Sequence, residues 1–230
     1  NAGYRKGIRE PDGFVARILG RYVNFMSNPD ERTAIDQFGT GDKYLGVATL
    51  LATLPGLPMF GHGQVEGFGE KYGMEFRRAM LQEQPDPELV ARHERSVFPL
   101  LRERWRFAGS EGFRLLDAFD GATLDEDVFA YANERHGARS LVVYRNRFAE
   151  GRVRIHGVRE ALGLPDDASA WVVLRDQRSG LEFLRSCRDV AANGLELDLH
   201  AYQCHVFLDP SVVHDDAAGD WARLAWRIGL

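Results

Sequence analysis

Two stretches in the first third of the chain carry polar side chains directly after short apolar runs. The stretch VNFMSNPDE ends with Asn28 and Asp30 close together. The stretch LPMFGHGQVEGFGEKYG carries His62 and Gln64 after its apolar start. A carboxylate, two amides and an imidazole can bind a polar ligand or exchange protons with it. The spacing therefore predicts a small-molecule site, unless these side chains only line a solvated loop.

The segments around these stretches alternate between strand-like and helical patterns. YVNFM and GLPMF are predicted to be short strands, the second of them buried, and GDKYLGVATLLATL between them is predicted to be a helix. DPELVARHERSVF is predicted to be another helix, because Asp86 caps helices well and Pro87 is favoured at the first helical position. This order predicts parallel strands. Ligands bind at the carboxyl ends of such strands, where both polar stretches would lie.

From about Glu111 the apolar residues recur with a period of two, which is typical of strands with one buried face. The predicted strands are GFRLLDAF, DVFAYANER, RSLVVYRNR, RVRIHGV, AWVVLRDQR and YQCHVFLD. Turn residues separate them, and this spacing is typical of an antiparallel sandwich or barrel. The last segment, GDWARLAWRIGL, is predicted to be an amphipathic helix that docks through Trp221, Leu224, Ala225 and Ile228.

The composition argues against several classes of protein. A net charge of −5 and an isoelectric point near 5.8 argue against a nucleic-acid partner. No apolar run reaches the roughly 18 residues of a membrane helix, so we expect a soluble protein with no membrane partner. The compartment stays open, with the cytoplasm favoured. The chain begins at Asn1 and not at Met, so we expect a processed chain or a piece of a longer one.

The cysteines and histidines show no metal-ligand pattern. Cys187 and Cys204 lack the spacing of a zinc site and are too few for a disulfide framework, so we expect two buried free thiols. The histidines show no metal-ligand spacing either. No metal site and no cofactor are therefore expected in this chain.

Four segments, in order, resemble the C-terminal half of the α-amylase superfamily of glycoside hydrolases and transglycosidases. FMSNPD resembles the motif F-x-x-N-H-D at the end of the seventh barrel strand. LPGLPMFGHGQ resembles the eighth-strand motif P-G-x-P-x-I-Y-Y-G-Q-E. RHERSVFPLLRERWRFAGSEGFRLLDAF and DVFAYANERHGARSLVVYRN resemble the last barrel helix and the opening strands of the C-terminal sandwich. The resemblance covers nearly the whole chain.

The resemblance implies a fold of two classes, α/β followed by all-β. Residues 1–108 would form the C-terminal part of a (β/α)8 TIM barrel, with its seventh and eighth strands. Residues 109–230 would form an antiparallel β-sandwich domain with a terminal helix. Calcium, where the enzyme needs it, would bind in the upstream region that precedes Asn1.

The resemblance also implies roles for particular residues. Asp30 matches the catalytic carboxylate that stabilises the transition state, and Asn28 matches the motif asparagine. His62 and Gln64 would contact the substrate from the second strand end, and Phe68 would stack on a sugar ring. Phe68 and Tyr72 are the aromatic residues of the second loop that are best placed for such stacking.

The motifs also depart from the family pattern. Pro29 replaces the motif histidine, and Gly61 and His62 replace the tyrosine pair. A retaining glycosidase needs a nucleophile and a general acid, which in this family lie on the fourth and fifth strands, upstream of Asn1. This chain alone would therefore not be a complete catalyst.

Three functions follow from these observations. The first is a part of a retaining glycoside hydrolase or transglycosidase acting on α-glucosidic linkages, with an α-glucan or maltooligosaccharide as substrate and the upstream part of the same polypeptide as partner. The second is a non-catalytic carbohydrate-binding or structural module derived from that family. The third uses Glu66 and Glu70 as an acid–base pair in an unrelated mechanism.

Overall fold

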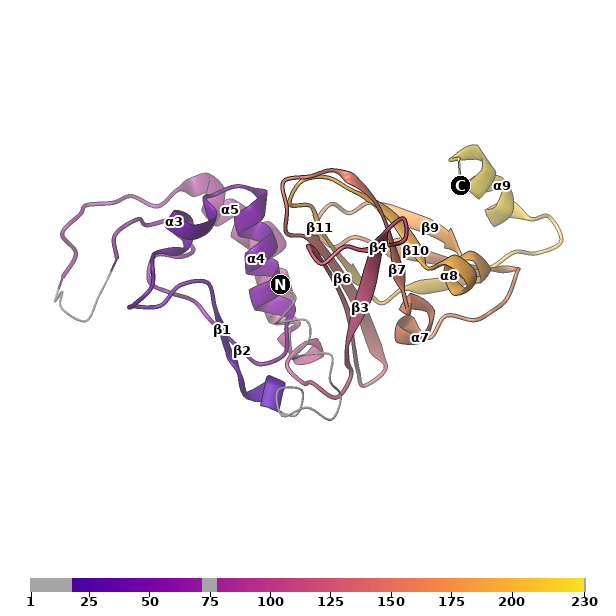
Figure 1. Ribbon diagram of the computed structural model, residues 1–230, viewed down its shortest axis with the longest axis horizontal. Coiled ribbons are helices and arrows are strands. Elements are labelled where there is room, and N and C mark those ends of the chain that lie inside the picture. Colours follow the sequence, from indigo (N-terminus) through magenta and orange to yellow (C-terminus); the bar gives the residue numbers. More distant parts are fainter. Residues whose placement is uncertain (1–17, 72–77, 230) are drawn as a thin grey trace. The chain divides into compact units, whose positions relative to one another are not determined.

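The computed structural model describes residues 18–71 and 78–229 (Figure 1). Backbone contacts divide the chain into two compact units. The described part of the first unit runs to Ser110, and the second unit begins at Glu111. The change from helical to period-two patterning near Glu111 therefore falls where the second unit starts.

The first unit combines a parallel strand pair with helices. β1 (Val23–Phe25) and β2 (Leu57–Met59) lie side by side, and Val23 is opposite Leu57 in a parallel register (Figure 1). The helices of its described part are η1 (Leu19–Arg21), α3 (Ala34–Phe38), α4 (Asp42–Thr53), α5 (Pro87–Ser96), α6 (Phe98–Arg102) and η2 (Arg104–Arg106). The predicted parallel pairing, with a helical crossover between the strands, is confirmed.

Local sequence explains where two of these helices form. α4 is apolar nearly all round, and most of its residues are buried. α5 begins after Asp86, whose carboxylate accepts hydrogen bonds from the N–H groups of Glu88 (2.9 Å) and Leu89 (3.2 Å). These contacts satisfy donors that the first helical turn leaves unpaired, and Pro87 provides the favoured first residue. Both helices were predicted and are confirmed.

The strand pair is much less buried than the sequence predicts. Leu57 is 62% exposed, and Val23 and Phe25 are each 47% exposed. The prediction of a buried second strand is therefore wrong for this chain. The physical reason is that each strand of the pair has one hydrogen-bonded neighbour in the described chain, so the pair lacks the cover of a larger sheet.

The second unit is built from antiparallel strands. One sheet has the order β10-β7-β3-β5-β6-β11, with β4 paired to β3, and the other has the order β12-β8-β9. The strands are β3 (Phe113–Asp120), β4 (Thr123–Leu124), β5 (Val128–Arg135), β6 (Ala138–Arg145), β7 (Gly151–His156), β8 (Ala170–Arg175), β9 (Glu182–Ser186), β10 (Leu195–Leu199), β11 (Cys204–Leu208) and β12 (Ser211–His214). The predicted strands and their antiparallel arrangement are confirmed.

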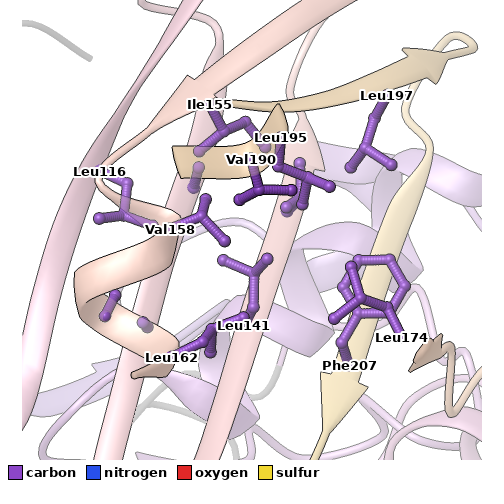
Figure 2. Close-up of a cluster of buried hydrophobic side chains, with 14 of the residues drawn as sticks. Leu116, Leu141, Ile155, Val158, Leu162, Leu174, Val190, Leu195, Leu197 and Phe207 are labelled. Carbon is purple, nitrogen blue, oxygen red and sulfur yellow. The ribbon is translucent and has the colours of Figure 1, made fainter. Parts of the chain in front are cut away.

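A single apolar core lies between the two sheets. It includes residues of both, and the short helices α7 (Val158–Leu162) and α8 (Cys187–Asn193) contribute Val158 and Val190 to it. Figure 2 shows these side chains converging with those of Leu141 and Ile155 on one interior. The isolated bridge between Asp176 and Phe207 connects the two sheets at one edge. The sequence predicted neither short helix.

The terminal helix α9 (Asp220–Arg227) forms as predicted but docks less completely. Ala225 is buried, whereas Leu224 is 42% and Ile228 is 56% exposed. The docking predicted through Leu224 and Ile228 is therefore wrong, because only one turn of the apolar face meets the rest of the unit. Cys187 and Cys204 are both buried and form no disulfide with each other, as expected. Within the described ranges, no helix is both long and apolar enough to cross a membrane.

Candidate functional site

Asn28 folds its side chain back onto the turn that follows β1. Its Oδ1 accepts hydrogen bonds from the backbone N–H groups of Asp30 (2.9 Å) and Glu31 (2.8 Å). This arrangement is an Asx turn, which Asn forms readily because its side chain mimics a backbone carbonyl. The turn places Asp30 at its tip, with the side chain exposed. Among the described residues, none donates a hydrogen bond to the Asp30 carboxylate.

Gln64 occupies the equivalent position after β2, but its side chain points into the fold. Gln64 is 2% exposed. Its Oε1 accepts a hydrogen bond from the N–H of Gly61 (3.1 Å), and its Nε2 lies 3.4 Å from the sulfur of Met26. Both ends of the amide are thus occupied within the chain. Gln64 therefore shapes the loop, and a contact between its amide and a substrate stays a prediction.

The two strand ends lie directly against each other. A Cβ atom added to Gly61 would fall 2.4 Å from Oγ of Ser27 and 3.2 Å from its carbonyl oxygen. Only glycine permits so close an approach of one backbone to the other. The Met26–Gln64 contact crosses between the same two ends. The two polar stretches identified in the sequence therefore follow adjacent strand ends.

Lys71 ties the second stretch to the tip of the first. Its Nζ donates a hydrogen bond to the backbone carbonyl of Asp30 at 2.7 Å. This contact adds to the Asx turn in fixing the backbone at Asp30. Lys71 could not be identified from the sequence, because nothing in the residue pattern indicates which carbonyl a lysine in a loop will reach.

Glu70 and Glu83 hold the loop that surrounds the second stretch. The Glu70 carboxylate accepts hydrogen bonds from the N–H groups of Met80 (2.6 Å) and Leu81 (3.0 Å). The Glu83 carboxylate accepts from the N–H groups of Gly69 (2.7 Å) and Glu70 (2.9 Å). Glu70 is therefore a structural group, and its pairing with Glu66 as an acid–base couple has no support in this geometry.

His62 and Phe68 form an aromatic pair in the same loop. Their ring centroids are 6.0 Å apart with an interplanar angle of 53°. His62 is exposed and Phe68 is half-buried, so both have surface that a ligand can reach. Tyr72, the other predicted stacking residue, lies outside the described residues.

Tyr44 and His93 form a buried polar cluster that supports the loop containing Gln64. The Tyr44 hydroxyl donates a hydrogen bond to the carbonyl of Gln64 at 2.5 Å, and the Tyr44 ring packs edge-on against His93. Burial, and secondarily the Glu66 carboxylate, raises the pKa of Tyr44. Burial also lowers the pKa of the His93 imidazole. Both side chains are therefore neutral near pH 7, and α4 and α5 hold the loop without a buried charge.

The structure thus divides the predicted site residues into two groups. Asp30, His62 and Phe68 present accessible surface, whereas Asn28 and Gln64 use amide groups to shape the loops. Across residues 18–71 and 78–229, no group of three His, Cys, Asp or Glu side chains is placed to hold a metal ion.

Comparisons with known proteins give matches in structure alone. No protein-family model matches the sequence, and no curated protein matches it. The fold is similar to that of the acarbose-complexed α-amylase of Geobacillus thermoleovorans, with 15% identity and a TM-score of 0.60. That match covers 86% of this chain and 40% of the amylase.

Other solved structures give the same result. A cyclomaltodextrin glucanotransferase with a three-domain ABC distribution matches at 14% identity and a TM-score of 0.61, over 84% of this chain and 37% of its own. A maltogenic α-amylase from Thermotoga neapolitana matches at 12% identity and a TM-score of 0.57, over 82% of this chain and 41% of its own. The chain therefore spans about 40% of the length of α-amylase-type chains and has the fold of their C-terminal portion.

Proposed function

We propose that this chain is the C-terminal part of a retaining enzyme that hydrolyses or transfers α-glucosidic linkages, and that Asp30 is its transition-state-stabilising carboxylate. The observation that carries the proposal is the position of Asp30. It is an exposed carboxylate at the tip of a hydrogen-bonded turn, directly after a strand of a fold similar to α-amylase-type enzymes. The structures that this fold resembles include an amylase bound to acarbose.

Asp30 would act through its charge. Glycosidic cleavage passes through an oxocarbenium-like transition state, and a fixed anion beside the sugar stabilises that positive charge. The Asx turn and the Lys71 contact fix the backbone at Asp30, so little reorganisation is needed during the reaction. Asn28 is a positioning residue in this account, because it acts on Asp30 and not on the sugar.

His62 and Phe68 would provide the remaining contacts with the substrate. An imidazole can hydrogen-bond a sugar hydroxyl, and an aromatic ring can stack on the apolar face of a pyranose. Gln64 would hold the loop from which these two side chains extend. Pro29 in the motif histidine's place removes one donor, so His62 is the candidate to replace that hydrogen bond.

The rest of the catalytic centre would come from an upstream part of the same polypeptide. The exposed apolar side chains of Val23, Phe25 and Leu57 support this, since neighbouring barrel strands would cover them. A nucleophile and a general acid would lie on those strands. The proposed partner is therefore the barrel that this strand pair would complete.

The reaction class can be tested in the complete protein by proton NMR of the products. We expect maltoheptaose to yield products whose new anomeric centre is first seen as the α-anomer, because double displacement retains configuration. A product first seen as the β-anomer would contradict a retaining mechanism.

The non-catalytic carbohydrate-binding module is the second candidate, and the substitutions in the motifs favour it. Pro29, Gly61 and His62 replace residues that the family uses around the sugar. Calorimetric titration of the complete protein with maltooligosaccharides separates the two candidates. Binding with no detectable turnover would support the module, whereas binding with turnover supports the enzyme.

A further inference from the structure

The second unit carries a pocket of about 430 Å³ on the outer side of the β7–β10 strand pair. Along β7 and β10, apolar side chains such as Ile155 and Leu197 enter the core. The alternate side chains, among them Arg154 and Glu196, point outward and line the pocket. Its volume falls within the range of about 300–1,000 Å³ that is usual for small-molecule sites. The proposed site at Asp30 has no residue in common with it.

Four charged side chains of the pocket form ion pairs across the β7–β10 strand pair. Arg154 donates to Oε2 of Glu196 through Nε (3.0 Å) and Nη2 (2.9 Å). Arg152 lies 3.3 Å from Oε1 of Glu196 and donates to Oδ1 of Asp198 at 3.1 Å. These are cross-strand pairs of the β7–β10 ladder, so the strands hold them in register.

The pocket as a whole is electrically balanced. Its lining includes the guanidinium groups of Arg152, Arg154 and Arg185 and the carboxylates of Asp189, Glu196 and Asp198. The lining carries equal numbers of positive and negative groups, and Arg152 and Arg154 are paired with carboxylates, so neither an anion nor a cation meets an excess of opposite charge. A neutral molecule with several hydroxyl groups suits such a surface better. Each hydroxyl can accept from a guanidinium and donate to a carboxylate.

Trp171 adds an aromatic surface to this polar lining. Its indole Nε1 donates a hydrogen bond to Oδ2 of Asp215 at 2.8 Å, so the direction of the ring is fixed and its donor is used. Oδ1 of Asp215 accepts the N–H of Trp221 at 2.7 Å and so anchors the start of α9. Gly229, just after α9, lines the pocket as well. Asp215 thus holds both the Trp171 ring and the start of the helix that leads to Gly229.

We propose that this pocket binds a neutral saccharide, with one sugar ring stacked on Trp171 and its hydroxyls bridging the Arg–carboxylate pairs. The stacked ring needs an apolar face and the paired charges need vicinal hydroxyls, and a pyranose supplies both. The saccharide class follows from the pocket alone. Its identity as an α-glucan rests on the proposed function.

The test is calorimetric titration of maltoheptaose into the complete protein carrying Asp30→Asn, which limits consumption of the probe. Adding Trp171→Ala should weaken one binding event about tenfold, because the stacking surface is lost. Adding Arg154→Ala should also weaken it about tenfold through loss of a charged donor. Arg154 has a side chain 53% exposed, so its removal should leave the fold intact if Trp171→Ala does not.

Arg147→Ala is the matched control. Its side chain is 60% exposed, it belongs to the same unit, and it pairs with Asp127 away from the pocket. We expect less than about a twofold change in affinity for this variant. The proposal is overturned if neither maltoheptaose nor cellopentaose binds with an affinity that falls in both Trp171→Ala and Arg154→Ala.

Two further probes separate this inference from the proposed function. If the affinity for cellopentaose, and not that for maltoheptaose, depends on Trp171 and Arg154, the pocket is still a saccharide site. The assignment of its ligand as an α-glucan then loses support. If inorganic phosphate shows that dependence and neither saccharide does, the pocket is an anion site and the proposal is wrong. Turnover measured with Asp30 intact reports on the proposed function separately.

Discussion

Similar apolar residues are exposed in the strand pair of the first unit and buried in the sandwich of the second. In the sandwich, Leu141 and Ile155 are completely buried between two sheets. In the strand pair, Phe25 is 47% and Leu57 is 62% exposed. The difference shows that the sandwich buries these apolar side chains itself, whereas the strand pair leaves its apolar side chains largely exposed.

The same contrast separates the polar residues of the two units. In the sandwich, Asp176 is buried and surrounded by donors, including His205 and the N–H of Val206. In the strand pair, Asp30 is exposed on a turn that its neighbour Asn28 builds. A buried carboxylate that accepts hydrogen bonds from its own chain stabilises the fold. An exposed carboxylate on a fixed turn is available to bind a ligand.

The largest effect that we expect is self-association of residues 1–230 when they are expressed alone. We expect this chain to associate or aggregate, because the strand pair presents open edges and exposed apolar side chains. Sedimentation velocity over a range of concentrations measures this. Replacing Val23, Phe25 and Leu57 together by Thr should reduce the association. A monodisperse monomer with one cooperative melting transition would contradict the account.

A truncation in the sandwich core should produce the next largest effect. Ile155→Ala removes a fully buried side chain and should lower the free energy of unfolding by about 3–4 kcal/mol. Leu181→Ala is the control, because Leu181 is 61% exposed in the same unit. Its expected cost is within about 0.5 kcal/mol. Denaturant unfolding of the complete protein measures both, and equal costs would argue against a closed core.

Lowering the pH should remove the contribution of Asp176 to the stability of the fold. Burial opposes its charge, but hydrogen bonds from His205, the Val206 N–H and Ser179 prevail and lower the pKa of Asp176 to about 2. Since the folded pKa lies below the unfolded value of 3.8, this stabilisation is present above pH 3.8 and is lost as the pH falls toward 2. It amounts to about 2 kcal/mol at neutral pH.

Asp176→Asn should therefore destabilise the protein at pH 7 and have little additional effect near pH 2. Chemical unfolding at pH 7, 4 and 2.5 provides the measurement. Asp198→Asn, at a carboxylate with a side chain 70% exposed, is the matched control. An equal loss of stability for both variants at pH 7 would show that the burial of Asp176 does not determine its contribution to stability.

The smallest effect concerns the reactivity of a thiol. Burial, and secondarily the charge of Asp167, raises the pKa of Cys187 to about 11. The reactive thiolate is therefore scarce at pH 8, and access is blocked as well. We expect Ellman's reagent to leave both cysteines unreacted in the folded protein and to titrate both after denaturation. Rapid labelling of Cys187 in the folded state would contradict the sandwich packing around α8.

Much of the fold could be predicted from local pattern. Asp86 and Pro87 mark the start of α5, and the period-two runs mark six strands of the second unit. β10 was missed, although Leu195–Leu199 alternates regularly, and β9 was missed because Phe183 and Leu184 interrupt the alternation. α7 and α8 are too short for a helical period to be read.

The candidate site was less predictable, because its geometry depends on contacts between distant segments. The two polar stretches were identified, and they do follow adjacent strand ends. That Gln64 would turn inward to Met26 could not be read from either stretch alone. The same holds for Lys71, which reaches a carbonyl 41 residues away in sequence. The pocket around Trp171 is lined by residues of β7, β8, β9, β10 and α8, and no single motif marks it.

The most direct test of the central claim is the turnover number of the complete protein before and after Asp30→Asn. The account predicts a loss of about a thousandfold in kcat on an α-glucan, because the stabilising charge is removed while shape is kept. Asp36→Asn is the control, since Asp36 is an exposed carboxylate of the same segment that pairs with Arg32. Asp30→Asn with near-full turnover would contradict the assignment of Asp30 to the catalytic centre.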